Sequence, residues 1–170
     1  SIDGYYLRAR TNGTGSWLEY TFDEGLDITR YPVMTWRWKT DRLPEVEWEK
    51  NEEEDDFALR IELVYDLPGN KWNPLNMARK GLVRGLFKGN PPELITSYVW
   101  AVNVPAEKPY PCPESEKTMI IPVQSTRYMT GRWLIESRNV AEDYEHFRSI
   151  HKLVLKKIRI RADTDNSMGM

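Results

Sequence analysis

The chain of 170 residues has the length of one domain, and its 40% hydrophobic and 29% charged residues exclude an intrinsically disordered protein. No apolar run approaches the ~20 residues that a membrane-spanning helix needs, and a net charge of −2 argues against a general nucleic-acid binder. One cysteine and two histidines exclude an internal disulfide and metal centres built from several residues of either type. We therefore expect a single domain over residues 1–170, with no membrane-spanning segment.

Segments in which apolar and polar residues alternate recur along the chain, and this period predicts strands with one buried face. We expect strands over residues 5–10, 17–22, 33–39, 57–65, 96–104, 119–124, 133–138 and 153–162. The pattern is clearest in 57–65, whose apolar face carries Phe57, Leu59, Ile61, Leu63 and Tyr65. Arg60 and Glu62 lie on its other face, and Arg37 lies opposite Trp36 and Trp38 in 33–39. We expect the mostly buried residues to include Trp36, Trp38, Leu59, Ile61 and Leu63.

Two segments predict short helices. Asn73 and Pro74 suit the N-cap and first position of a helix over 75–87. Asn139 begins a second helix over 139–149, with Glu142 placed as in a capping box. The proline-rich residues 105–113 predict a loop. Eight strands and two short helices without β-α-β alternation predict a mainly β fold, an antiparallel β-sandwich of the jelly-roll type.

Five sequence blocks occur in the order of one known family. They are VMTWRWK (33–39), DDFALR (55–60), YVW (98–100), ESRNV with a following DY (136–144), and ADTDN (162–166). Together they resemble the bacterial domain-of-unknown-function family 3047. The resemblance implies a galactose-binding-like β-sandwich and an exported protein, periplasmic or extracellular. In that family a further strand follows the last block, so we expect terminal strands of the full-length protein to lie outside residues 1–170.

The last block contains a cluster of oxygen-bearing side chains: Asp163, Asp165 and Asn166. Clustered carboxylate and amide oxygens suit a hard cation, so one interpretation is a structural Ca²⁺ site. The alternative is an Asx-rich turn in which these side chains bond their own backbone.

Charge is distributed unevenly along the chain. Residues 41–56 contain nine acidic residues, which is typical of a solvated loop, whereas residues 147–162 contain six basic residues and no acid. Lys157, Arg159 and Arg161 share one strand face, which either binds an anionic glycan or partner or balances acids of the same molecule. Arg138 suits carboxylate recognition, and it equally suits an ion pair.

The residues favour binding over catalysis, because no Gly-x-Ser-x-Gly motif occurs and neither histidine has an evident nucleophilic partner. We expect a non-catalytic exported β-sandwich that binds a glycan of the cell envelope or extracellular space. The expected ligand-binding residues are Arg37, Arg60, Glu62, Tyr98, Trp100 and Arg138, with Tyr98 or Trp100 as the stacking ring. Two alternatives stay open: a polysaccharide-cleaving enzyme using acidic-loop carboxylates and Arg138, and a structural subunit that docks an envelope protein.

Overall fold

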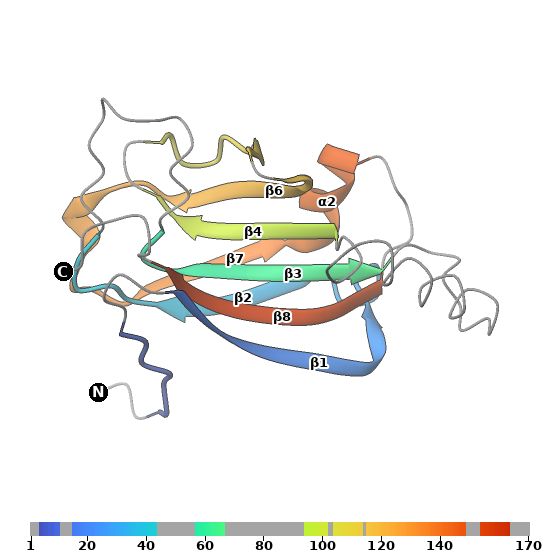
Figure 1. Cartoon of the computed structure of the whole chain (residues 1–170), viewed down its shortest axis with the longest axis horizontal. Helices are drawn as coiled ribbons and strands as arrows, with labels where there is room; N and C mark the ends of the chain where they lie inside the picture. The colour runs from blue at the N-terminus through green and yellow to red at the C-terminus, as the bar shows by residue number, and fades with distance from the viewer. Residues whose placement is uncertain are drawn as a thin grey trace.

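The computed structural model describes residues 4–10, 15–43, 57–66, 94–101, 104–113, 115–148 and 154–163. These residues fold mainly into strands, as the sequence predicts (Figure 1). The elements in chain order are β1 (Gly15–Asp27), β2 (Val33–Trp38), β3 (Arg60–Asp66), β4 (Leu94–Trp100), β5 (Tyr110–Cys112), β6 (Ser115–Gln124), the 3₁₀ turn η1 (Arg127–Met129), β7 (Leu134–Asn139), α2 (Val140–Arg148) and β8 (Val154–Asp163). In the described part of the chain, no helix is long and apolar enough to cross a membrane.

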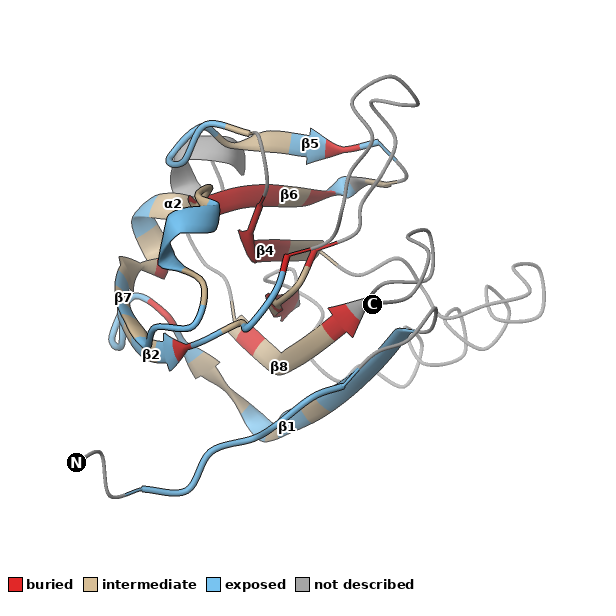
Figure 2. Cartoon of the chain, turned by 90° about the vertical axis from the view of Figure 1, so that its left-hand side faces the viewer, coloured by how far each residue is buried: buried red, intermediate tan, exposed pale blue. Residues whose placement is uncertain are grey.

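The strands form two layers. A six-stranded sheet has the order β1-β8-β3-β4-β6-β5, and β2 pairs with β7 in a two-stranded sheet that lies against one face of it (Figure 2). Aromatic rings join the layers, because the ring centroid of Trp36 lies 5.3 Å from that of Tyr98, and that of Trp38 lies 5.8 Å from that of Trp100. The predicted two-layer arrangement of strands is therefore present.

One strand pair departs from the expected antiparallel order. β4 runs parallel to β6, whereas the other paired strands are antiparallel. The cause is β5, a three-residue strand inside the segment that the sequence predicts as a loop. It pairs antiparallel with β6 and reverses the chain between β4 and β6, so the large sheet is mixed.

The core lies between the two layers, where β3 and β4 present the alternating apolar face that the sequence predicts. Leu63 and Tyr65 are buried, and Ile61 and Leu59 are partly buried beside them. Trp38 is buried and Trp36 is partly buried, so none of the five residues expected in the core is exposed. Residue 57 is the exception to the predicted face.

Phe57 precedes β3 and packs in a second cluster on the opposite face of the sheet. Its buried companions there are Val99, Ala101, Cys112 and Ile120. Because both faces of β3 are covered, Arg60 and Glu62 are buried as well, at 3% and 5% exposure. A central strand with two buried faces explains why alternation alone misassigned Phe57.

One predicted helix is confirmed, whereas the predicted N-terminal strand is wrong. Helix α2 is where the sequence places it, and the Asn139 side chain accepts a hydrogen bond from the Glu142 backbone N–H at 3.3 Å, as a cap does. Residues 5–10, expected as a strand, are exposed and belong to neither sheet. The helix expected over 75–87 lies outside the described residues.

Candidate ligand-binding site

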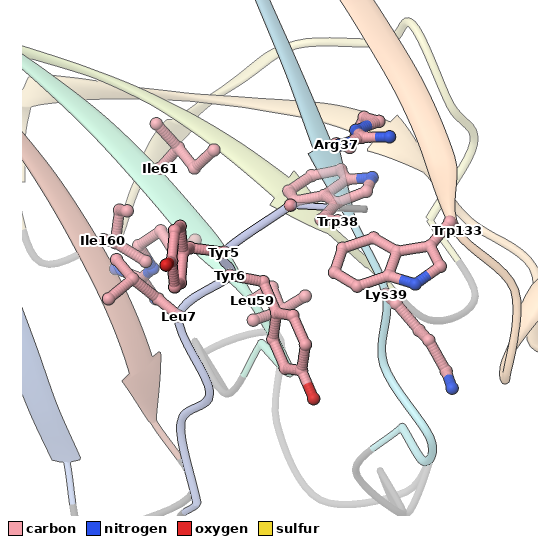
Figure 3. Close-up of a pocket in the computed structure, with 12 residues that line it drawn as sticks. Tyr5, Tyr6, Leu7, Arg37, Trp38, Lys39, Leu59, Ile61, Trp133 and Ile160 are labelled. Atoms are coloured by element: carbon pink, nitrogen blue, oxygen red, sulfur yellow. The ribbon is translucent and has the colours of Figure 1, made fainter. Parts of the chain in front are cut away.

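A pocket of about 330 Å³ opens between the two layers, at the end where β2 finishes and β3 begins (Figure 3). This volume is within the ~300–1,000 Å³ range of small-molecule sites. Its described lining comes from residues 4–7, 37–39 and 59–61, together with Trp133 and Ile160. Segments far apart in the sequence therefore build it jointly.

Aromatic side chains form much of the wall. Trp38 and Trp133 stand on one side of the pocket, and Tyr5, Leu7 and Ile160 stand on the other. The Tyr6 ring meets Trp133 edge-on, with centroids 5.8 Å apart. Trp133 is 40% exposed and Tyr6 is 67% exposed, so both rings offer area to a ligand.

Backbone contacts hold Trp133 in place. The Thr126 hydroxyl accepts a hydrogen bond from the Tyr128 N–H at 3.1 Å and so begins the η1 turn. Gly131 follows with a φ of +76°, and its N–H donates to the Thr40 carbonyl at 2.8 Å. This bond ties the segment before β7 to the end of β2, which positions Trp133 beside Trp38.

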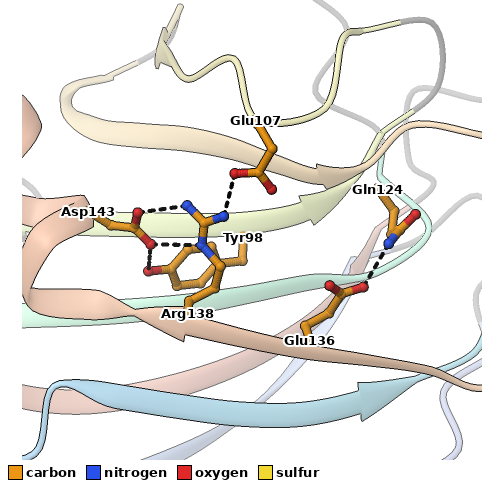
Figure 4. Close-up of polar contacts among 6 residues, drawn as sticks. All are labelled: Tyr98, Glu107, Gln124, Glu136, Arg138 and Asp143. Atoms are coloured by element: carbon orange, nitrogen blue, oxygen red, sulfur yellow. Dashed lines mark hydrogen bonds and ion pairs between the residues drawn. The ribbon is translucent and has the colours of Figure 1, made fainter.

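A polar cluster behind the wall fixes Trp38 itself. The Glu136 carboxylate accepts a hydrogen bond from the Trp38 indole N–H at 3.1 Å. It also accepts one from the Gln124 amide at 2.9 Å (Figure 4). A buried indole N–H needs such a partner. The sequence alone does not predict a site role for Tyr5, Tyr6, Trp133 or Glu136. The signal it offers is the pair of adjacent aromatic residues at positions 5 and 6.

The charged groups of the described lining are basic. They are Arg37, Lys39 and Arg60. The Arg60 guanidinium lies on the far face of the large sheet. There it is 3.6 Å from the Glu62 carboxylate and stacks over the Phe57 ring. The Lys39 ammonium pairs with the Asp41 carboxylate at 3.2 Å beside the pocket, and Arg37 projects from the outer face of the two-stranded sheet.

The pocket opens onto an uncovered strip of the large sheet. Leu18 pairs with Ile160, a lining residue, and Tyr20 pairs with Ile158 on the same face. Leu18 is 56% exposed and Tyr20 is 65% exposed, although this face is buried further along the sheet. A ligand longer than the pocket could therefore continue along β1.

Arg37 and Arg60 both contribute to the pocket lining, but the structure does not bring the charged groups of the predicted binding residues together. Arg37 lies on the outer face of the two-stranded sheet, whereas Arg60 and Glu62 lie on the outer face of the six-stranded sheet. The prediction that Arg37, Arg60 and Glu62 form one surface is therefore wrong. β2 and β3 belong to different layers, and their outer faces point in opposite directions. Tyr98 and Trp100 are 0% exposed in the core, so neither ring can stack on a ligand.

Arg138 is held in a structural network (Figure 4). Its guanidinium donates to both carboxylate oxygens of Asp143, at 3.0 and 2.7 Å, and also contacts the Glu107 carboxylate. Asp143 further accepts the Tyr98 hydroxyl at 2.8 Å. The bond to Asp143 raises the pKa of Arg138, and burial raises the pKa of Tyr98. These contacts support the ion-pair interpretation of Arg138.

The basic face of β8 is matched by acids on neighbouring strands. Glu19 lies 2.6 Å from Arg159 and 3.0 Å from Lys157, which lowers the pKa of Glu19. Glu62 lies 3.8 Å from Arg159 and 4.0 Å from Arg161. This agrees with the interpretation that the molecule balances these cations internally.

The predicted calcium residues fall at the end of the described chain. Asp163 ends β8, and its side chain, Asp165 and Asn166 lie outside the described residues. The calcium site thus stays a prediction. Within the described ranges, no three His, Cys, Asp or Glu side chains gather as metal ligands would.

Comparison with known proteins identifies the family. Residues 3–170 match the family described as "Protein of unknown function (DUF3047)", so the chain belongs to this family, as the five sequence blocks indicate. No curated protein and no solved structure matches the chain.

Proposed function

We propose that this member of the DUF3047 family is a non-catalytic binding module whose pocket holds a glycan of the cell envelope or extracellular space. The observation that carries the proposal is the pair of exposed rings, Tyr6 and Trp133, set in a concave site with polar groups at its rim. A pyranose has an apolar C–H face and a rim of hydroxyls. Burying that face against a ring removes apolar surface from water, and rim groups then fix the orientation.

Binding is favoured over cleavage by the chemistry of the lining. A glycosidase of the common type needs two carboxyl groups roughly 5–10 Å apart across the scissile bond. The described lining contains no acidic side chain, and Arg138 is engaged by Asp143 and Glu107 away from the pocket. The described residues thus supply a surface for recognition rather than an acid and a nucleophile.

One observation favours the structural-subunit alternative as a second candidate. Leu18 and Tyr20 leave apolar sheet exposed beside the pocket, and an extended segment of an envelope protein would cover it. Substitution separates the two candidates, because only glycan binding needs the ring of Trp133.

The test is affinity electrophoresis through gels containing a panel of neutral and acidic polysaccharides, followed by calorimetry with the polymer that retards the protein. We expect Trp133→Ala to weaken binding about tenfold or more, equivalent to ~1.4 kcal/mol. Tyr128→Ala is the matched control, because Tyr128 is 92% exposed and does not line the pocket. Retardation by none of the polymers, or equal binding by Trp133→Ala, would overturn the proposal.

A further inference from the structure

Strand β1 has uncovered side chains on both of its faces. Leu18 and Tyr20 point to the face that carries the pocket, and Trp17 points to the opposite face. Each of these three side chains is more than half exposed, and Figure 2 shows most of β1 exposed. β1 is also the outermost strand at its end of the described sheet, so its outward backbone N–H and C=O groups point away from β8. An edge of this kind is a template for pairing with another strand.

The regular part of β1, residues 15–21, lacks the features that keep sheet edges apart. It contains neither proline nor lysine, and its register against β8 is unbroken. Its charged residue is Glu19, and the carboxylate of Glu19 is paired with two cations of β8 in the same molecule. The next acids, Asp23 and Glu24, fall in the stretch 22–25, where the register shifts. The regular stretch is therefore an apolar edge whose charge is already balanced.

We propose that two copies of this chain associate edge to edge, with β1 of one copy antiparallel to β1 of the other about a two-fold axis at Leu18. Dimers with this closed symmetry are the commonest soluble oligomers. Residues 15–21 are centred on Leu18, so this axis pairs the whole regular stretch with itself. The proposal concerns assembly and does not depend on which ligand the pocket holds.

The side chains of the stretch are complementary to one another about this axis. Leu18 lies opposite Leu18 of the second copy, and Trp17 lies opposite Glu19, so no like charges meet. An axis at Glu19 would instead place two carboxylates opposite each other. An axis at Tyr20 would pair the strand into the irregular stretch 22–25. An axis at any other residue pairs fewer residues of the regular stretch, so charge and register both favour Leu18.

The pairing joins the large sheets of the two copies into one. Backbone hydrogen bonds across the edge replace bonds to water, and each contributes only ~0.5–1.5 kcal/mol. The two-fold axis is perpendicular to the sheet, so Leu18 and Tyr20 of both copies lie on the same face of the joined sheet. A single strand pair buries little area, and we therefore expect a weak dimer that dissociates in the range of ~10–100 µM.

Sedimentation of the whole chain over a concentration series tests the association. We expect the average mass to rise from that of one chain at ~1 µM toward that of two chains at ~300 µM, and no further, because a two-fold contact closes on itself. Leu18→Lys places two like charges at the axis and should weaken association about tenfold or more. Ile135→Lys is the matched control, because Ile135 is an exposed apolar residue on a strand of the other sheet.

A cysteine at the axis tests the register. Opposite Cα atoms of an antiparallel pair lie ~4.5–5.5 Å apart, within the range of a disulfide, so mild oxidation should cross-link Leu18→Cys into a covalent dimer. Tyr20→Cys is the matched control on the same face, because its two copies are four residues apart along the joined strands, about 13 Å or more. The native Cys112 is buried and is present in both variants.

Each outcome decides for or against the proposal. A single-chain mass at all concentrations would overturn it, as would association that a folded Leu18→Lys variant retains in full. Cross-linking of Tyr20→Cys in place of Leu18→Cys would show a different register and overturn the axis at Leu18. The two cysteine variants decide the register even where Leu18→Lys proves unstable, because both keep an uncharged side chain on the edge.

Discussion

Arg138 illustrates how partners decide the role of a single residue. Its bidentate contact with Asp143, and the contact of Asp143 with Tyr98, connect β7, α2 and β4. The sequence could name Arg138 as a carboxylate-binding group. It could not show that the carboxylate belongs to the same molecule, five residues further along the chain.

Removal of this guanidinium should therefore destabilise the fold rather than weaken ligand binding. Arg138→Met leaves the Asp143 carboxylate, only 15% exposed, without its main partner, and truncating one member of such a pair costs ~2–5 kcal/mol. Chemical denaturation should show a loss of that order. The affinity of the folded variant for its polysaccharide should stay within about twofold of wild type; a tenfold weaker affinity at unchanged stability would return Arg138 to the binding site.

At the level of strands, the sequence predicted most positions because alternation is a local signal. It placed β2, β3, β6, β7 and β8 within a few residues of their observed bounds. It could not place β2 in a different layer from β3, since layer membership depends on pairing partners distant in sequence. Tyr98 and Trp100 were misassigned for the same reason: the second layer covers the face that carries them.

One irregularity between β1 and β8 gives a sharp prediction. The register shifts between Thr21 and Leu26, and Gly25 within this shift has a φ of +79°. A Cβ at this position would lie 2.2 Å from Cγ1 of Val154. Gly25→Ala therefore combines an unfavourable backbone conformation, ~1–2 kcal/mol, with overpacking of ~1–3 kcal/mol.

Gly131→Ala is the matched control for that variant. Gly131 has a similar φ of +76°, but nothing lies within 4 Å of a Cβ built there. Thermal unfolding should rank the variants with Gly25→Ala the least stable, Gly131→Ala intermediate and wild type the most stable. If the two substitutions proved equally costly, the close approach of Val154 would have no energetic effect.

At the scale of the whole molecule, the pocket depends on segments that only the complete fold brings together. Tyr6 lies in an N-terminal segment outside both sheets, Lys39 follows β2, and Trp133 precedes β7. Each looks like an ordinary aromatic or basic residue in the sequence. Fold class follows from local periodicity, whereas this site follows from the contact between layers, and so the sequence predicted the first and missed the second.

Charge across the large sheet gives a pH-dependent prediction for the whole molecule. Glu19 of β1 bonds Arg159 and Lys157 of β8, and the hydrogen bond from Arg159 is the main cause of its lowered pKa. The folded-state pKa of Glu19 lies below the unfolded one, so protonation favours unfolding. The stabilisation is present above the ordinary pKa of 4.5 and is lost as the pH falls through the lowered folded-state value.

Glu19→Gln should remove part of this acid sensitivity. We expect the variant to be less stable than wild type at pH 7 and to lose less stability between pH 5 and about pH 2, measured as the free energy of unfolding in urea. Glu24→Gln is the control: Glu24 is exposed on the same strand, pairs with no cation in the described ranges, and should leave the pH profile as in wild type. Parallel profiles for wild type and Glu19→Gln would show that the ion pairs between β1 and β8 do not contribute to stability, and that the cations of β8 depend on other partners.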